Sequence, residues 1–155
     1  MNSIIVFLGE YLGHILLVGL LVFWWENRKK YPRLLWGLFA AAILSRGIVT
    51  ELIRFFWERP RPFVEQNITP FIEHVASPSF PSGHATLFFA LGTALFLYNK
   101  TAGVVFLLGA AILSSARVFA FLHWPSDIIG GAAIGIISGV LVVIVSRHLQ
   151  NKKNQ

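Results

Sequence analysis

The chain has 155 residues, of which 55% are hydrophobic and only 13% are charged. That hydrophobic fraction exceeds the roughly 45–50% of soluble domains, and the length fits one domain, which we expect to span residues 1–155. Disulfides, thiol chemistry and cysteine-ligated metals are excluded because the chain has no cysteine. The net charge of +6 would suit a nucleic-acid ligand, but the positions of the charges indicate a membrane protein instead.

Five apolar stretches are long enough to form membrane-spanning helices, which need about 20 mainly apolar residues. We predict these helices over about 3–25, 34–57, 82–99, 102–122 and 126–146. The first is expected to be retained rather than cleaved, because it lacks a basic start and a small-residue cleavage site. The sequence therefore predicts an all-α fold, a polytopic membrane helix bundle with about five transmembrane helices.

The connections between these helices differ in charge and length. Basic residues cluster at 28–33, at Lys100 and after residue 146, and the positive-inside rule makes that side cytoplasmic. The N-terminus and the connection 58–81 then lie outside the cell membrane, and the C-terminus lies in the cytoplasm. We interpret the positive charge as a topology signal with some contact to anionic membrane lipids, and we expect no nucleic-acid partner.

The fifth predicted helix carries Gly131, Gly135 and Gly139 at four-residue spacing. Small residues at this spacing let membrane helices approach closely. We interpret the stripe as packing within the chain rather than as a dimer interface, and the sequence leaves the oligomeric state open.

Three groups of ionisable residues are expected at the outer ends of the helices. A charge near hydrocarbon costs several kcal/mol unless it is paired or hydrated. The convergence of these groups therefore calls for an anionic partner. The groups are Arg54, Arg59 and Arg61; His84; and Arg117, His123 and Asp127.

The arginines have two interpretations. An arginine at a helix end can simply extend its head group to the membrane interface, and we favour that interpretation for Arg59. For Arg54 and Arg61 we favour anion binding, because the planar guanidinium fork suits phosphate. The charged pairs Arg46–Glu51 and Glu10–His14 are interpreted as supporting or interhelical contacts rather than as catalytic groups.

The segment Pro81–His84 reads PSGH and is typical of a helix start, with serine as the cap. The first amides of a helix are free donors that favour an anion, and Gly83 lets a ligand approach the backbone. His84 then lies where it could protonate a bound oxyanion. A plain cap also explains the segment, so this motif alone leaves both possibilities open.

His123 and Asp127 follow the fourth predicted helix, with Trp124–Pro125 forcing a turn between them. The pair could brace a helix junction. It could also form a catalytic unit in which Asp127 fixes one imidazole tautomer and leaves the other nitrogen as a nucleophile.

Together, the three groups resemble the motifs of the PAP2 superfamily, the type 2 phosphatidic acid phosphatases. The first family motif, a basic residue, six others and Arg-Pro, matches Arg54 and Arg61–Pro62. The second matches Pro81–His84 in full, and the third, Ser-Arg-x5-His-x3-Asp, matches Arg117, His123 and Asp127. Two positions depart from the family pattern: Arg54 replaces the usual lysine, and Ala116 replaces the serine before the motif arginine.

The resemblance implies a phosphatase that works through a phosphohistidine. By that analogy His123 is the nucleophile, Asp127 orients it, and His84 protonates the leaving oxygen. The groups expected to bind phosphate are Arg54, Arg61, Arg117, Ser82 and Gly83. Neither a metal nor another cofactor is expected, because three arginines can stabilise the phosphoryl charge.

The stretch from Arg59 to His84 looks particularly like the undecaprenyl-diphosphate phosphatases of the family. The predicted substrate is therefore undecaprenyl diphosphate, hydrolysed at the outer membrane face. His74 belongs to the same resemblance and could contact the second phosphate, although an ordinary loop histidine is an equal alternative. Phosphatidylglycerophosphate, phosphatidic acid and lipid A phosphates are alternative substrates. A protein that binds or transports an anionic lipid without chemistry is the alternative from another class.

Overall fold

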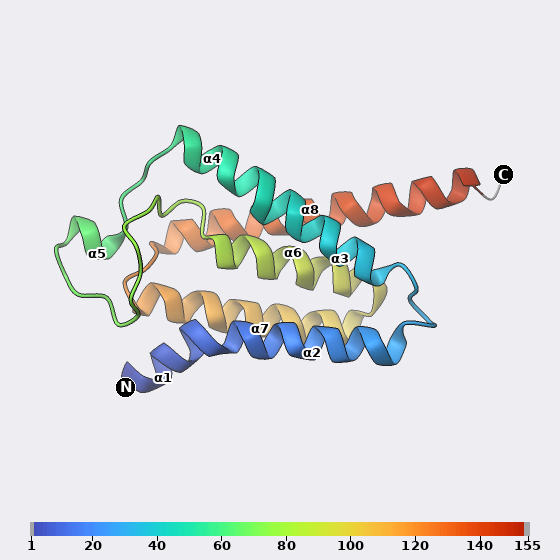
Figure 1. The fold of residues 1–155 in the computed structure, drawn as a ribbon, viewed down its shortest axis with the longest axis horizontal. Helices are drawn as coiled ribbons and strands as arrows, with labels where there is room; N and C mark the ends of the chain where they lie inside the picture. Colours follow the sequence, from blue (N-terminus) through green and yellow to red (C-terminus); the bar gives the residue numbers. More distant parts are fainter. Residues whose placement is uncertain (1, 154–155) are drawn as a thin grey trace.

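The computed structural model describes residues 2–153. The first two long helices, Ser3–Asn27 and Leu34–Phe56, are each continuous, and each contains a π-helical turn. Each long continuous helix is called a rod below. The elements in chain order are α1 (Asn2–Val6), η1 (Phe7–Tyr11), α2 (Leu12–Asn27), α3 (Leu34–Ala42), η2 (Ile43–Val49), α4 (Thr50–Phe56), α5 (Pro62–Glu65), α6 (Gly83–Tyr98), α7 (Lys100–Phe119) and α8 (Pro125–Lys153). Within residues 2–153 the five predicted rods are present, together with the short α5 (Figure 1).

The ends of two helices, α7 and α8, differ from the prediction, whereas α6 lies within one residue of the predicted 82–99. Four rods are long and apolar enough to cross a membrane, whereas α6 has only 16 residues. Two capping residues set its limits. Ser82 caps its start, and Asn99, just after its end, is the N-cap of α7, where its side chain accepts a hydrogen bond from the Ala102 amide. α7 ends at Phe119 rather than near residue 122, and α8 continues beyond the predicted 146 to Lys153.

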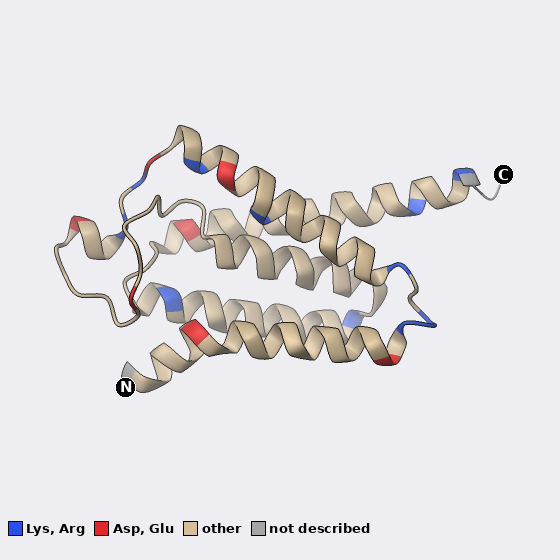
Figure 2. Cartoon of the chain, in the orientation of Figure 1, with Lys and Arg blue, Asp and Glu red and all other residues tan. Residues whose placement is uncertain are grey.

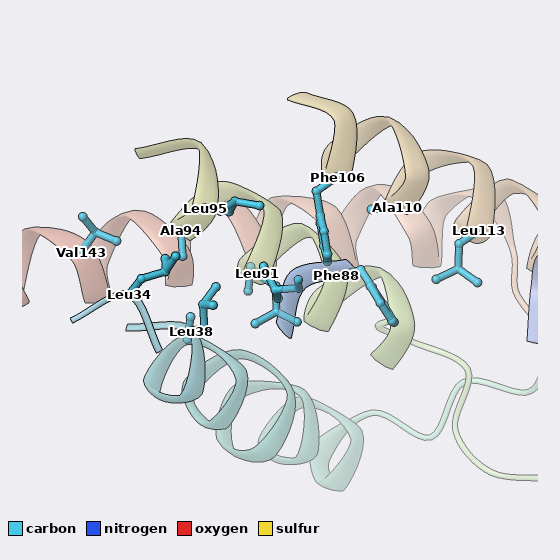
Figure 3. Close-up of a cluster of buried hydrophobic side chains, with 13 residues drawn as sticks. Leu34, Leu38, Phe88, Leu91, Ala94, Leu95, Phe106, Ala110, Leu113 and Val143 are labelled. Atoms are coloured by element: carbon cyan, nitrogen blue, oxygen red, sulfur yellow. The ribbon is translucent and has the colours of Figure 1, made fainter. Parts of the chain in front are cut away.

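α6 lies at the centre of the bundle and packs most extensively against α8, α7 and α3. Figure 3 shows side chains that fill this core: Leu34 and Leu38 from α3 lie beside Ala94 and Leu91 of α6. The neighbouring rods thus cover the short helix, which contributes ten buried residues. A helix covered by protein on most sides does not need the length of a lipid-exposed span.

α6 and α8 run in the same direction, because α7 carries the chain back between them (Figure 1). The glycine stripe of α8 faces α6: a Cβ atom at Gly135 would lie 2.5 Å from the backbone oxygen of Thr86. Gly131 and Gly139 make similarly close contacts to α6. The stripe therefore serves packing within the chain, and it brings the starts of two helices together at one end of the bundle.

The outer surface of the rods is apolar. Phe55 and Phe56, at the end of α4, are 78% and 81% exposed, and large apolar side chains are exposed along the other long rods. Figure 2 shows charged residues mainly toward the two ends, with long uncharged stretches of helix between them. This pattern is that of a multi-pass membrane protein.

Candidate active site

A cavity of about 240 Å³ opens where α4 ends and α6 begins, and its walls are rich in arginine and histidine. Its lining residues are Arg46, Arg54, Arg61, His74, Ser77, Gly83, His84, Leu87, Arg117 and His123. Most of the residues predicted for the site are thus brought together, from helices and connections far apart in the sequence. Ser82 and Asp127 do not line the cavity. A larger cavity of about 590 Å³, between α3 and α8 toward the opposite end, is mainly apolar.

His123 lies between α7 and α8 and is only 2% exposed. Its Nδ1 atom is 3.0 Å from the backbone oxygen of Ser79 and 3.5 Å from the Oδ2 atom of Asp127. Both neighbours are acceptors, so Nδ1 carries the proton and Nε2 keeps its lone pair. The expected Asp127 contact is present, but the Ser79 carbonyl is nearer and shares the task of fixing the tautomer.

The electrostatic surroundings keep this imidazole neutral. Burial lowers the pKa of His123 to about 4, and the positive charges of Arg61 and Arg117 act in the same direction. The Asp127 carboxylate opposes them without cancelling them. At neutral pH the Nε2 atom is therefore an unprotonated nitrogen beside the cavity, 3.3 Å from the Nη1 atom of Arg61.

Asp127, in the first turn of α8, is fully buried. Its Oδ2 atom accepts a hydrogen bond from the backbone N–H of Trp124 at 2.9 Å, and its Oδ1 atom accepts one from Arg59 at 2.8 Å. Arg59 also donates to the Ser126 hydroxyl. The interpretation of Arg59 as a plain interface anchor is therefore wrong: a fully buried carboxylate requires a cation, and Arg59 supplies it.

Arg61 is held rigidly by backbone acceptors. It is 2% exposed, its Nε donates to the Ser77 oxygen, and its Nη1 donates to the Leu122 oxygen, both at 2.9 Å. Burial lowers the pKa of Arg61 to about 10, so the guanidinium remains charged at neutral pH. A fixed cation of this kind is preorganised for an anion.

Arg117 and Arg54 approach the cavity from the ends of two helices. The Nη1 of Arg117 donates to the Gly9 oxygen at 2.8 Å, and the Nη2 of Arg54 donates to the Pro81 oxygen at 3.0 Å. Among the described residues, the buried Nε atoms of both arginines have no hydrogen-bond partner. Buried donors without a partner are costly, and an anion in the cavity would satisfy them.

The start of α6 forms another wall. Ser82 is the N-cap: its Oγ accepts from the Ala85 amide at 3.4 Å, and the residue is fully buried. This geometry differs from the predicted direct phosphate contact, because a capping side chain folds back onto its own helix. Gly83 and His84 do line the cavity, and the His84 ring stacks on Phe88 with centroids 6.2 Å apart.

Sequence reasoning missed several contributors. Arg46, interpreted from the sequence as an interhelical tie, lines the cavity, and the Ser79 carbonyl holds the His123 ring. The dense arginine spacing between 46 and 61 is a signal for Arg46, whereas nothing in the sequence marks a backbone carbonyl. Among residues 2–153, no three His, Asp or Glu side chains are arranged to hold a metal.

The arrangement suits a tetrahedral oxyanion. One neutral imidazole nitrogen faces a cavity walled by four guanidinium groups, a glycine backbone and the imidazoles of His74 and His84. Guanidinium groups bind phosphate oxygens with paired hydrogen bonds, and an adjacent imidazole can attack phosphorus. Such a site can transfer a phosphoryl group.

Comparison with known proteins identifies similar sequences and structures. The profile described as the PAP2 superfamily matches residues 34–150. The Bacitracin transport permease protein BcrC of Bacillus licheniformis is 32% identical over 143 residues, covering 92% of this chain and 70% of that protein. The Undecaprenyl-diphosphatase BcrC of Bacillus subtilis is 30% identical over 143 residues, covering 91% and 72%. The crystal structure of Aquifex aeolicus LpxE superposes with a TM-score of 0.76 at 27% identity, covering 92% and 84%.

Proposed function

The chain belongs to the PAP2 superfamily, and on this premise we propose that it is a membrane lipid phosphatase converting undecaprenyl diphosphate into undecaprenyl phosphate and inorganic phosphate. The observation that carries the proposal is the neutral Nε2 of His123 beside a cavity walled by arginines. The similarity to the Undecaprenyl-diphosphatase of Bacillus subtilis supports the choice of substrate.

The first chemical step forms a phosphoenzyme. The lone pair of His123 Nε2 attacks the terminal phosphorus, and the bond from that phosphorus to the bridging oxygen breaks. Its electron pair stays with the departing lipid phosphate, to which His84, protonated once the anionic head group is bound beside it, gives a proton. Asp127 and the Ser79 carbonyl stabilise the positive charge that grows on the ring, since both face its Nδ1 atom.

The second step returns the enzyme to its starting state. His84, now neutral, takes a proton from a water molecule, whose oxygen attacks the phosphohistidine. The phosphorus–nitrogen bond breaks, its electrons return to Nε2, and inorganic phosphate leaves. Each turnover thus consumes one water and leaves both histidines in their original protonation states.

Charge stabilisation in both steps falls to Arg54, Arg61 and Arg117. In phosphoryl transfer, catalysis comes mainly from positioning and electrostatics. Arg61 is held by three backbone carbonyls and the Ser77 side chain, so little reorganisation is needed when charge develops on the phosphoryl oxygens. The Gly83 amide, at the start of α6, adds a donor backed by the helix dipole.

The orientation of the protein in the membrane follows from the charges at the two ends of the helix bundle. The 28–33 connection and the end of α8 are rich in lysine and arginine. They lie at the other end of the bundle from the start of α6 (Figure 2), where Gly83 and His84 line the cavity. By the positive-inside rule we propose that the cavity faces the outside and the C-terminus the cytoplasm. The substrate head group would then be hydrolysed at the outer leaflet.

Transport without chemistry is the competing function, and the name of the Bacillus licheniformis relative includes that activity. Binding alone needs cations but no oriented nucleophile. The neutral, doubly held His123 ring therefore favours hydrolysis.

The test is phosphate release in detergent with EDTA present. Undecaprenyl diphosphate, phosphatidylglycerophosphate and phosphatidic acid serve as substrates for wild type, His123→Ala and His148→Ala. His148 is an exposed histidine near the end of α8, so its variant controls for the loss of an imidazole. We expect release mainly from undecaprenyl diphosphate and a loss of at least about 1,000-fold only in His123→Ala. Undiminished release by that variant would refute the mechanism, and preference for another lipid would refute the substrate.

A further inference from the structure

Arg46 contacts the cavity from a helix that the mechanism above uses only through Arg54. It lies in η2, and its side chain is 39% exposed, which places it at the rim rather than in the depth of the cavity. Its guanidinium pairs with Glu51. The same side chain lies across the start of α6: a Cβ atom at Gly83 would be 2.6 Å from the Arg46 Nε. A side chain at position 83 would displace Arg46 from this place.

The π-helical turn explains why Arg46 faces the cavity. Arg46 and Arg54 are eight positions apart; two α-helical turns account for about seven of these, and the wider turn takes up the extra residue. Both arginines therefore lie on one face of the rod. The turn is stabilised from within, because the Thr50 hydroxyl donates to the Ser45 carbonyl at 2.9 Å and both residues are fully buried.

We propose that Arg46 binds the second, lipid-linked phosphate of a diphosphate substrate and so selects diphosphates over monophosphates. The inference rests on the proposed function, which puts the terminal phosphate at His123. The departing oxygen then lies near His84, and the next phosphate lies beyond it, toward Gly83 and the rim. Arg46 is the cation found there.

The charges of the cavity agree with two phosphates rather than one. Four guanidinium groups line it, and Glu51 offsets part of the charge of Arg46 and Arg54. A phosphomonoester carries about −1.5 to −2 at pH 7, for which Arg54, Arg61 and Arg117 suffice. A second phosphoryl group adds about one further negative charge, and Arg46 is the matching cation.

The test compares two non-hydrolysable ligands that share a farnesyl tail, one a phosphonate and the other a methylenediphosphonate. Binding to the purified protein in detergent is measured by calorimetry. For Arg46→Gln we expect the Kd of the diphosphonate to rise about 10-fold, as for one charge-assisted contact, and that of the phosphonate to change less than about 2-fold. Arg46→Lys, which keeps the charge, should recover part of the loss.

Two further variants separate this role from a structural one. Glu51→Gln breaks the ion pair but keeps the cation, so it should bind the diphosphonate at least as tightly as wild type. Arg33→Gln removes a cation toward the opposite end and should change neither Kd. Equal losses for both ligands in Arg46→Gln, a loss in Glu51→Gln matching that of Arg46→Gln, or no wild-type preference for the diphosphonate would each overturn the inference. Because binding is measured without turnover, failure of the phosphatase assay is a separate result.

Discussion

Replacing Gly135 by alanine adds one methyl group where α8 approaches α6 most closely. The new Cβ atom would lie 2.5 Å from the backbone oxygen of Thr86 and 2.9 Å from the backbone nitrogen of Ala90. Ordinary contact begins at 3.4 Å, so the two helices must separate locally by roughly 0.9 Å to relieve the shorter contact. No side-chain rotation can relieve it, because both contacted atoms belong to the backbone.

The separation should reach the proposed site. Thr86 lies two residues after His84, and Gly135 lies about two turns after Asp127. Overpacking of this kind typically costs about 1–3 kcal/mol of stability, and misplacing a catalytic group by about 1 Å can lower a rate about 100-fold. We therefore expect Gly135→Ala to hydrolyse undecaprenyl diphosphate about 10–100 times more slowly than wild type and to unfold at a lower temperature.

The control is the same substitution at Gly19 in α2, where an added Cβ atom would have no neighbour within 4 Å. Gly19→Ala should keep the wild-type rate and should be slightly stabilised, because alanine favours a helix over glycine by about 1 kcal/mol. Phosphate release and thermal unfolding in detergent are measured for both variants. If Gly135→Ala equals Gly19→Ala in rate and unfolding temperature, the α6–α8 contact does not position the site.

Three other variants or conditions test single interactions. Arg59→Gln leaves the buried Asp127 without its cation, so the free energy of unfolding should fall by roughly 1–3 kcal/mol, and hydrolysis should slow; unchanged unfolding would contradict the ion pair. Asn99→Ala removes the side chain that accepts from the Ala102 amide at the start of α7, and we expect a loss of about 1 kcal/mol with an unchanged turnover rate. Burial lowers the pKa of His123 to about 4, so between its unfolded value near 6.5 and 4 only the unfolded chain binds that proton. This contribution to stability is complete above pH 6.5 and decreases as the pH is lowered toward 4. Between pH 7.5 and 5 the free energy of unfolding of wild type should therefore fall by about 2 kcal/mol more than that of His123→Ala. Equal decreases for the two proteins in denaturation experiments would contradict the shifted pKa.

The helices were predictable because membrane spans are defined by apolar length, a property of the local sequence. The limits of α6 were predictable too, because its capping residue Ser82 and the turn at Asn99 mark them in the sequence. The ends of α7 and α8 were less predictable, because the apolar run continues past Phe119 and the helix of α8 continues past the apolar run. The π-helical turns were not predicted, since they depend on packing and on contacts such as that between Thr50 and Ser45.

The composition of the site was predictable where spacing along one element decides which groups meet. His123 and Asp127 are four positions apart across a turn, and the structure brings their side chains within 3.5 Å. The convergence of three distant groups was predicted from their shared membrane face, but the individual hydrogen-bond partners from distant segments could not be predicted. The pairing of Arg59 with Asp127 joins residues 68 positions apart, and the Ser79 carbonyl reaches His123 from a connection without regular structure.

The location of the cavity at the end of the bundle has a thermodynamic consequence for a lipid substrate. Arg54 and Arg117 lie in the last turns of their helices, and His84 lies in the first turn of its own. A phosphate at that level can reach all three while its hydrocarbon chain stays among the lipids. Withdrawing the chain would cost about 0.8 kcal/mol for each CH₂ group, a barrier that would soon exceed the whole binding energy of the head group. The bilayer thus holds the tail, lateral diffusion delivers it, and the protein needs to recognise only the charged end.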